Sequence, residues 1–384
     1  MEYLDRLSSL LKRFVENGPA GCALSVMHNG EVVFEDYVGN EDMETKKPIA
    51  PDTIYRIYSN SKVITCVAAL MLYERGLFLL NDPLEEYLPE FKHPQVYQTG
   101  KDNELEIVPA TRSITVKDLF TMTSGLTYAG NQFETERQVA KRLETEAERE
   151  DWNVRSLSKT LASIPLAFDP GTRWHYGFSH DILGALIEVL SGKTFGQFLK
   201  DEIFKPLGMK DTFFKIPEEK KHRLCSLYDR SEEGQLIKNT SMDSRYQPGT
   251  LIESGGGGLL STLEDYSRFG HMLANGGELD GIRILGRKTI ELMSTNHLSP
   301  ELLQHYNWDA LKGYGYGLGV RTMINPAAGG SNSSLGEFGW MGRAGTWLMV
   351  DMKENLSAVY MQQMVPNFEA VHHPRLRNVI YGAV

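Results

Sequence analysis

The sequence predicts an α/β (α+β) fold in which strands from both ends of the chain form one antiparallel sheet flanked by helices, with a mainly helical region inserted between them. β-rich runs stand at residues 21–39 and 345–364, whereas helical patterns fill most of the sequence between them. A third observation is the apolar run at about 59–75, because a helix that is apolar on all sides is buried.

These patterns predict a single domain over residues 1–384. Its α/β lobe is expected to comprise about 1–80 and 250–384, and its helical lobe about 81–249. Two lobes that are joined in this way meet at a cleft.

The N-terminal part is predicted to contain an amphipathic helix, a hairpin and the buried helix. Charged residues are spread through 1–18 with helical spacing. The two β-rich runs that follow meet at Asn29-Gly30, which is the strongest short-range signal for a hairpin. Gly76 supplies the left-handed residue that commonly ends a helix.

The inserted region is predicted to hold short helices joined by turns and loops. Short helices are expected at 84–91 and 115–125, and an amphipathic helix at 179–191. The polar stretch 95–113 is interpreted as a surface loop. Glu, Arg and Lys at helical spacing over 128–160 predict a solvated helical cap.

The C-terminal part begins with the four-glycine run Gly255–Gly258, which we interpret as a place of close backbone packing. A helix follows within 259–277, and the alternating glycines of 313–319 predict a glycine-punctured strand. Two strands within 345–364 surround a charged turn, and an amphipathic segment from Phe368 closes the chain.

Composition excludes several classes of function. The net charge of −10, without a dense Lys/Arg run, argues against nucleic-acid binding. No stretch approaches the roughly 18 apolar residues of a membrane span, and the N-terminus lacks a signal-peptide pattern, so the expected location is the cytoplasm. Three scattered cysteines predict reduced thiols, and the histidines show no metal-ligand spacing, so neither a metal nor another cofactor is expected. His372-His373 is interpreted as an exposed pair.

The motif Ser-x-x-Lys occurs three times, at Ser9–Lys12, Ser59–Lys62 and Ser156–Lys159. Only the second match opens a buried helix, whereas the other two lie in charged segments. A hydroxyl and an amine three residues apart share one face of a first helical turn. Such a pair at a helix N-terminus has the parts of an activated nucleophile, although a plain helix cap is the alternative.

Two further segments strengthen the catalytic interpretation. Trp174–Gly184 places Tyr176 on a loop before a helix, and Trp340–Thr346 leads into a strand. In this order the three segments resemble the serine β-lactamase and penicillin-binding-protein superfamily, and more closely its family VIII carboxylesterases. Further landmarks of the resemblance are 114–125, 205–212 and 255–262, so it covers nearly the whole chain.

The resemblance implies a role for each matching residue. Ser59 matches the acylated serine, Lys62 its partner and Tyr176 the proposed general base. The backbone N–H groups of Ser59 and Arg343 are implied to form the oxyanion hole. The place of Lys-Thr-Gly in lactamases is taken here by Trp340, Met341 and Gly342.

Physical reasoning leaves the base open between the lysine and the tyrosine. If Lys62 is partly desolvated it is expected to lose proton affinity, and its charged form would favour a tyrosinate at Tyr176. Either group could accept the proton of Ser59.

Two departures from the lactamase pattern bear on the substrate. Phe178 stands where lactamases have Asn, and Trp340 begins the segment where they have Lys. Both changes add apolar surface in place of polar groups, so uncharged, apolar esters are favoured over β-lactams. Tyr128 is expected to line the pocket or to lie in the core, and Asp181 to cap or anchor its helix.

The expected function is therefore hydrolysis of short-chain carboxylic esters through an acyl-enzyme on Ser59. The alternatives are a β-lactamase or D-amino-acid peptidase, an acyltransferase with the same acyl-enzyme, and a non-enzymatic penicillin-binding module. The expected partner is a small-molecule ester, and a homodimer remains an open alternative.

Overall fold

The computed structural model describes residues 4–100, 102, 104–146 and 149–384. Its main sheet has the strand order β12-β13-β14-β15-β16-β1-β2-β3. These strands are β12 Tyr314–Tyr316, β13 Arg321–Met323, β14 Phe338–Met341, β15 Trp347–Asp351, β16 Leu356–Gln362, β1 Gly21–His28, β2 Glu31–Asp42 and β3 Lys47–Pro48. Because β1 pairs antiparallel with β16, the two ends of the chain share one sheet, as predicted.

The hairpin between β1 and β2 turns at Asn29-Gly30, where both residues have positive φ angles of 52° and 88°. This conformation suits asparagine and glycine and matches the twist of the strands, which confirms the hairpin prediction.

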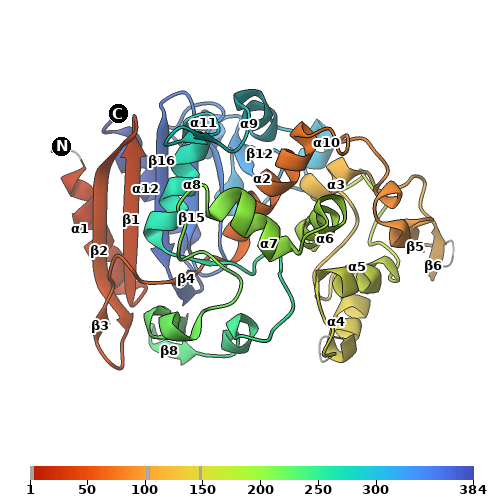
Figure 1. Ribbon diagram of the computed structural model, residues 1–384, viewed down its shortest axis with the longest axis horizontal. Coiled ribbons are helices and arrows are strands. Elements are labelled where there is room, and N and C mark those ends of the chain that lie inside the picture. The colour runs from red at the N-terminus through yellow and green to blue at the C-terminus, as the bar shows by residue number, and fades with distance from the viewer. Residues whose placement is uncertain (1–3, 101, 103, 147–148) are drawn as a thin grey trace.

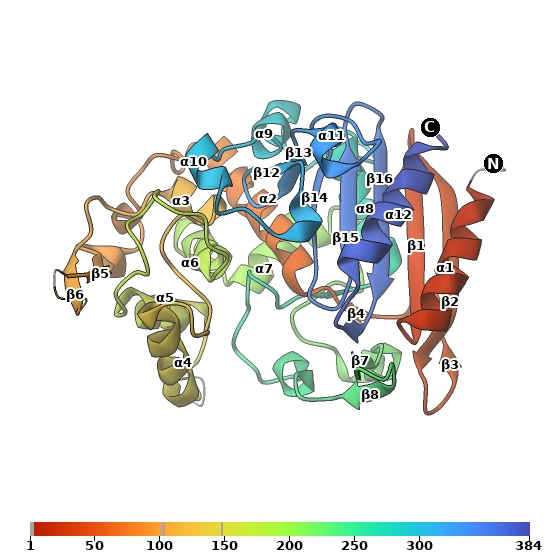
Figure 2. The same ribbon diagram turned by 180° about the vertical axis from the view of Figure 1, so that it is seen from behind.

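Helices cover both faces of the sheet (Figures 1 and 2). Helix α8 (Leu263–Ala274) packs on one face against β1, β15 and β16. Helices α1 (Asp5–Asn17) and α12 (Glu369–Tyr381) lie on the opposite face and contact each other.

The buried helix α2 (Ser61–Glu74) packs against α6 (Ser179–Ser191) beside the sheet. Every residue of α2 from Ser61 to Leu72 is buried, as its apolar sequence predicts. The other helices of the inserted region are α3 Val116–Phe120, α4 Glu134–Glu146, α5 Val154–Ala162 and α7 Phe195–Leu199, which continues into a π-helical turn, Lys200–Phe204. Later helices are α9 Arg287–Met293, α10 Pro300–Leu303 and α11 Pro326–Gly329.

Short strands outside the main sheet pair in smaller sheets. Strand β4 pairs with β9, β7 with both β8 and β17, and β10 with β11. Their bounds are β4 Tyr55–Arg56, β7 Leu227–Arg230, β8 Leu236–Asn239, β9 Leu260–Ser261, β10 Glu278–Leu279, β11 Ile282–Arg283 and β17 Met364–Val365. The lobe boundaries near residues 80 and 250 stay a prediction.

Several local predictions were wrong. The stretch 95–113 forms the hairpin β5 (Gln95–Thr99) and β6 (Leu105–Pro109), whose β-forming residues are interspersed with polar ones. The predicted helix at 84–91 is two 3-10 turns, since Pro89 cannot donate a helical hydrogen bond. The alternating glycines of 313–319 do not form one continuous strand: only Gly315 lies in a strand, β12, and Gly319, with a φ of 84°, belongs to the turn that leads to β13.

His372 and His373 are buried rather than exposed. His372 stacks on Phe14 with a ring distance of 3.9 Å, and His373 stacks on Trp347 at 5.4 Å. Both rings are buried because α12 packs them against α1 and the sheet.

The cysteines Cys22, Cys66 and Cys225 are all buried and unpaired. Within the described chain, no single helix is long and apolar enough to cross a membrane. The bent pair Ser179–Ser191 and Phe195–Phe204 meets that requirement by length and composition only.

Candidate active site

Ser59 lies on a 3-10 turn, Tyr58–Asn60, that leads directly into α2. The preceding residue, Tyr58, has a φ of 43°, a left-handed conformation that is uncommon for a bulky side chain. Tyr58 is held there by packing on Leu227 and Ala344. The strained turn leaves Ser59 half-buried at the mouth of the helix, while its neighbours are buried.

Lys62 is fully buried, and its Nζ has three acceptors. It lies 3.3 Å from Ser59 Oγ, 2.9 Å from Tyr128 Oη and 2.5 Å from the carbonyl oxygen of Gly256. An ammonium has three N–H donors, so this arrangement satisfies each of them. The site is therefore built to hold Lys62 in its charged form.

The electrostatics agree with this geometry. Burial alone lowers the pKa of Lys62, but Tyr128, Tyr176 and Asp181 outweigh it and hold the pKa above its ordinary value. Desolvation acts in the expected direction, but the neighbouring groups reverse the net shift.

Two tyrosines enclose the ammonium in different ways. The Nζ of Lys62 lies 4.5 Å from the ring centroid of Tyr176, so this ring covers the cation. The Oη of Tyr176 instead accepts a hydrogen bond of 3.1 Å from Nε1 of Trp340. Burial raises the pKa of Tyr128 although Lys62 opposes the shift, so Tyr128 stays a phenol.

The two predicted oxyanion donors are available for a ligand. Within the described part of the chain, the backbone N–H groups of Ser59 and Arg343 donate to no other residue. The side chain of Thr346 links the two segments: its Oγ1 donates to the Ile57 carbonyl at 3.1 Å and accepts from Asn60 Nδ2 at 3.0 Å. The Gly342 N–H in turn donates to the Thr346 carbonyl at 2.8 Å.

Thr346 was missed by sequence reasoning. A threonine at the start of a strand is an ordinary β-former, and nothing in its neighbourhood distinguishes it.

The four-glycine run lies along the first turns of α2, which supports the interpretation of close backbone packing. The Gly255 carbonyl accepts from Thr65 Oγ1 at 2.8 Å, and the Gly256 carbonyl accepts from Lys62. A Cβ at Gly255 or Gly256 would collide with residues of α6.

The remaining predicted residues form an aromatic wall beside the lysine. Phe178 meets Tyr128 edge to face at 4.6 Å, and Trp340 stacks on Tyr176 at 5.7 Å. Trp308, which the sequence did not single out, lies 5.2 Å from Tyr176 and keeps 38% of its surface exposed. Met341 is buried at the end of β14, opposite Trp347.

The other two Ser-x-x-Lys matches are separate from this site. Ser9 and Lys12 are exposed on α1. Ser156 lies on α5, where its hydroxyl bonds to the Asp151 carbonyl.

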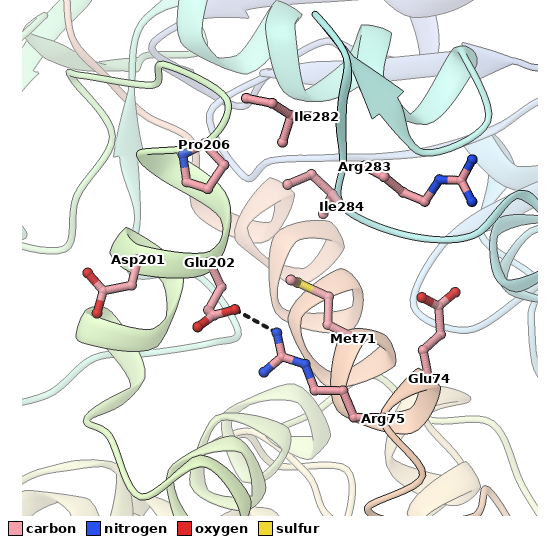
Figure 3. Close-up of a pocket in the computed structure, with 9 residues that line it drawn as sticks. All are labelled: Met71, Glu74, Arg75, Asp201, Glu202, Pro206, Ile282, Arg283 and Ile284. Atoms are coloured by element: carbon pink, nitrogen blue, oxygen red, sulfur yellow. Dashed lines mark hydrogen bonds and ion pairs between the residues drawn. The ribbon is translucent and has the colours of Figure 1, made fainter.

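A cavity of about 440 Å³ lies at the opposite end of α2 (Figure 3). Charged side chains at its rim are paired: Arg75 donates to Glu202 at 2.6 Å, and Glu74 accepts from the Gly286 N–H. It contains no serine or cysteine, and it is separated from Ser59 by the length of a helix, about 20 Å. The described residues contain no group of three or more His, Cys, Asp or Glu that could hold a metal ion.

Comparison with known proteins finds similar chains. A family model described as Beta-lactamase matches residues 7–381. Protein Rv1367c of Mycobacterium tuberculosis (strain ATCC 25618 / H37Rv) is 29% identical over 91% of this chain and 86% of its own. Esterase EstB of Burkholderia gladioli is 26% identical over 94% and 91%.

Among solved structures, EstCE1, described as a hydrolase with promiscuous acyltransferase activity, superposes with a TM-score of 0.84. It is 22% identical, and the match covers 99% of this chain and 98% of EstCE1. This likeness shows a shared fold.

Proposed function

This chain belongs to the β-lactamase family, and we propose that it is a serine hydrolase that cleaves short-chain carboxylic esters through an acyl-enzyme on Ser59. The predicted superfamily resemblance and the β-lactamase/transpeptidase-like fold are confirmed. The observation that supports the catalytic proposal most strongly is the convergence of Lys62 Nζ on Ser59 Oγ at 3.3 Å.

Tyr176 is the proposed general base. Lys62 is unsuited to accept a proton because it is held as an ammonium by three acceptors. Lys62 Nζ lies 4.5 Å from the Tyr176 ring centroid and the Trp340 N–H donates to the Tyr176 oxygen, so both groups stand where they would stabilise negative charge on that oxygen as it takes the proton. Tyr128 holds the ammonium from the other side.

The reaction proceeds in two halves. Tyr176 takes the Ser59 proton as Oγ attacks the ester carbonyl carbon, and the N–H groups of Ser59 and Arg343 stabilise the oxyanion. Collapse breaks the ester C–O bond, and the leaving alcohol takes the proton from Tyr176. Water then attacks the acyl-enzyme with the same base, which releases the acid and restores Ser59.

The walls of the site favour apolar, uncharged esters. Phe178 and Trp308 are partly exposed and lie against Tyr128 and Tyr176, while the buried Trp340 stacks on Tyr176 from within. Such surfaces bind apolar groups.

The first test compares hydrolysis of p-nitrophenyl acetate and butyrate by the wild type and by Ser59→Ala. Ser9→Ala is the matched control, because Ser9 belongs to an exposed Ser-x-x-Lys match. We expect Ser59→Ala alone to lose activity. Equal rates for Ser59→Ala and the wild type would refute the proposal.

An acyltransferase is the second candidate, and the description of EstCE1 favours its inclusion. An added alcohol that diverts the acyl group from water would support it. Nitrocefin turnover that rivals ester turnover would instead favour the β-lactamase alternative. The homodimer and the cytoplasmic location stay predictions.

A further inference from the structure

Asp181 is a buried carboxylate that the proposed reaction does not use. It lies in the first turn of α6 with 1% of its surface exposed. It was expected to cap or anchor its helix, but its Oδ1 accepts from Ser254 Oγ at 2.5 Å and from the Gly256 N–H at 3.2 Å. Its Oδ2 has no hydrogen-bond partner among the described residues. Burying a carboxylate oxygen without a hydrogen-bond partner costs free energy, so we expect a positive charge nearby to offset that cost.

The bonds of Asp181 lead to the lysine through the glycine run. The peptide between Gly255 and Gly256 donates its N–H to Asp181 and accepts from Thr65 with its carbonyl. The next carbonyl, that of Gly256, accepts from Lys62 at 2.5 Å. Thr65 and Lys62 are three residues apart, hence on the same face of α2. Asp181 therefore fixes the backbone segment against which the ammonium rests.

Because Gly256 has no side chain, Tyr128 Oη and Asp181 Oδ2 can both lie close to its backbone. A Cβ placed there would lie 2.8 Å from Tyr128 Oη and would also collide with Asp181 Oδ2. Both oxygens thus approach the same backbone atom, beside the carbonyl that binds Lys62.

We propose that Asp181 is a positioning residue that fixes the Gly255–Gly256 peptide under Lys62 and compensates the buried charge of that ammonium. This proposal rests on the proposed function, because the ammonium is the partner of Ser59. Lys62 and Asp181 form no ion pair within the described structure, so the carboxylate acts through space and through the peptide.

The other titratable groups around Lys62 and Asp181 are mainly neutral. Burial raises the pKa of Asp181 above its ordinary value, and Lys62 together with the hydrogen bonds from Ser254 and Gly256 offsets only part of this rise. Burial also raises the pKa of Tyr128. Burial lowers the pKa of His180 to about 3, so this neighbouring imidazole carries no charge at neutral pH. Burial also raises the pKa of the Cys66 thiol. The titratable groups around Lys62 are Tyr128, Tyr176, His180, Asp181 and Cys66.

The test uses Asp181→Asn, which keeps an oxygen for Ser254 and Gly256 but removes the charge. We expect kcat for p-nitrophenyl butyrate to fall roughly 10- to 100-fold, by analogy with the loss seen when the residue that orients a metal ligand is removed. KM is expected to change little. The alkaline limb of the kcat–pH profile should move to lower pH, because Lys62 loses a group that stabilises its charged form.

Two variants separate positioning from plain structural support. Asp265→Asn removes another buried carboxylate, one that bonds to Thr212 and to the Asp211 N–H away from the site. We expect it to lower the melting temperature without moving the pH profile. Ser254→Ala should reduce kcat less than Asp181→Asn does. The alkaline limb of its kcat–pH profile should stay at the wild-type pH. A profile for Asp181→Asn that coincides with that of Asp265→Asn would overturn the proposal.

A readout without turnover distinguishes failure of this proposal from failure of the proposed function. The ¹⁵N signal of the Lys62 ammonium, assigned by its loss in Lys62→Met, can be titrated by NMR in wild type and Asp181→Asn. A lower Lys62 pKa in Asp181→Asn supports the positioning role even if no ester is hydrolysed. An unchanged Lys62 pKa overturns it even if the wild type proves to be an active esterase.

Discussion

Replacing Gly342 by alanine tests the oxyanion hole with a single methyl group. An added Cβ would lie 2.5 Å from the Ile57 carbonyl oxygen and would also collide with Thr346 Oγ1. The two segments must therefore separate by about 0.9 Å to reach an ordinary 3.4 Å contact at Ile57. This movement carries the N–H of Arg343 away from that of Ser59. A misplacement of about 1 Å in a catalytic group can cost roughly 100-fold in rate.

We therefore expect Gly342→Ala to lower kcat about 100-fold on p-nitrophenyl butyrate, measured by steady-state hydrolysis. Overpacking is expected to cost about 1–3 kcal/mol of stability, so circular dichroism must confirm folding at the assay temperature. Gly382→Ala is the control, because a Cβ there meets no atom closer than the Asn378 carbonyl oxygen at 3.2 Å, on α12 and away from the site. A folded Gly342→Ala protein with wild-type kcat would refute the assignment of the oxyanion hole.

Three further predictions concern the base, the acid stability and the aromatic wall. Tyr176→Phe should lower kcat by roughly 100- to 10,000-fold as expected for a lost general base, and Tyr128→Phe by only about tenfold for one lost hydrogen bond to a charge; the reverse order would make Tyr128 the base. Burial lowers the pKa of His180 to about 3 and that of His372 to about 4, so below pH 6.5 the unfolded chain binds more protons. Stability should then fall by about 1.4 kcal/mol per pH unit for each histidine as the pH drops toward 4, and melting temperatures that are flat from pH 6.5 to 4.5 would contradict this. Trp308→Ala should raise KM for p-nitrophenyl butyrate about fivefold through loss of about 1 kcal/mol of aromatic contact, whereas an unchanged KM would place Trp308 outside the binding surface.

Local signals in the sequence were sufficient to predict the elements that bear the proposed nucleophile. The apolar run of α2 predicts a buried helix, and this context singled out Ser59 and Lys62 among three matches of the same spacing. The segments around Tyr176 and Trp340 were needed to favour catalysis over a helix cap. Asn29-Gly30 predicts its hairpin because the turn is determined by residues next to each other.

Contacts between distant segments were harder to predict. Tyr128 reaches Lys62 from a loop 66 residues away, and nothing in its neighbourhood distinguishes a lysine ligand from a core tyrosine. Asp181 and Thr346 form hydrogen bonds with backbone groups of distant segments, and no sequence pattern predicts such bonds. The hairpin β5–β6 was missed because its polar residues conceal the alternation of its strands.

The central claim is that Ser59 forms a covalent acyl-enzyme. The most direct measurement is intact-mass spectrometry of the protein mixed rapidly with p-nitrophenyl butyrate and quenched in acid, followed by peptide mapping. We predict a mass increase of one butyryl group, located on the peptide that contains Ser59 and absent from Ser59→Ala. Rapid hydrolysis by the wild type with the adduct on another residue, or an adduct that persists in Ser59→Ala, would contradict the account.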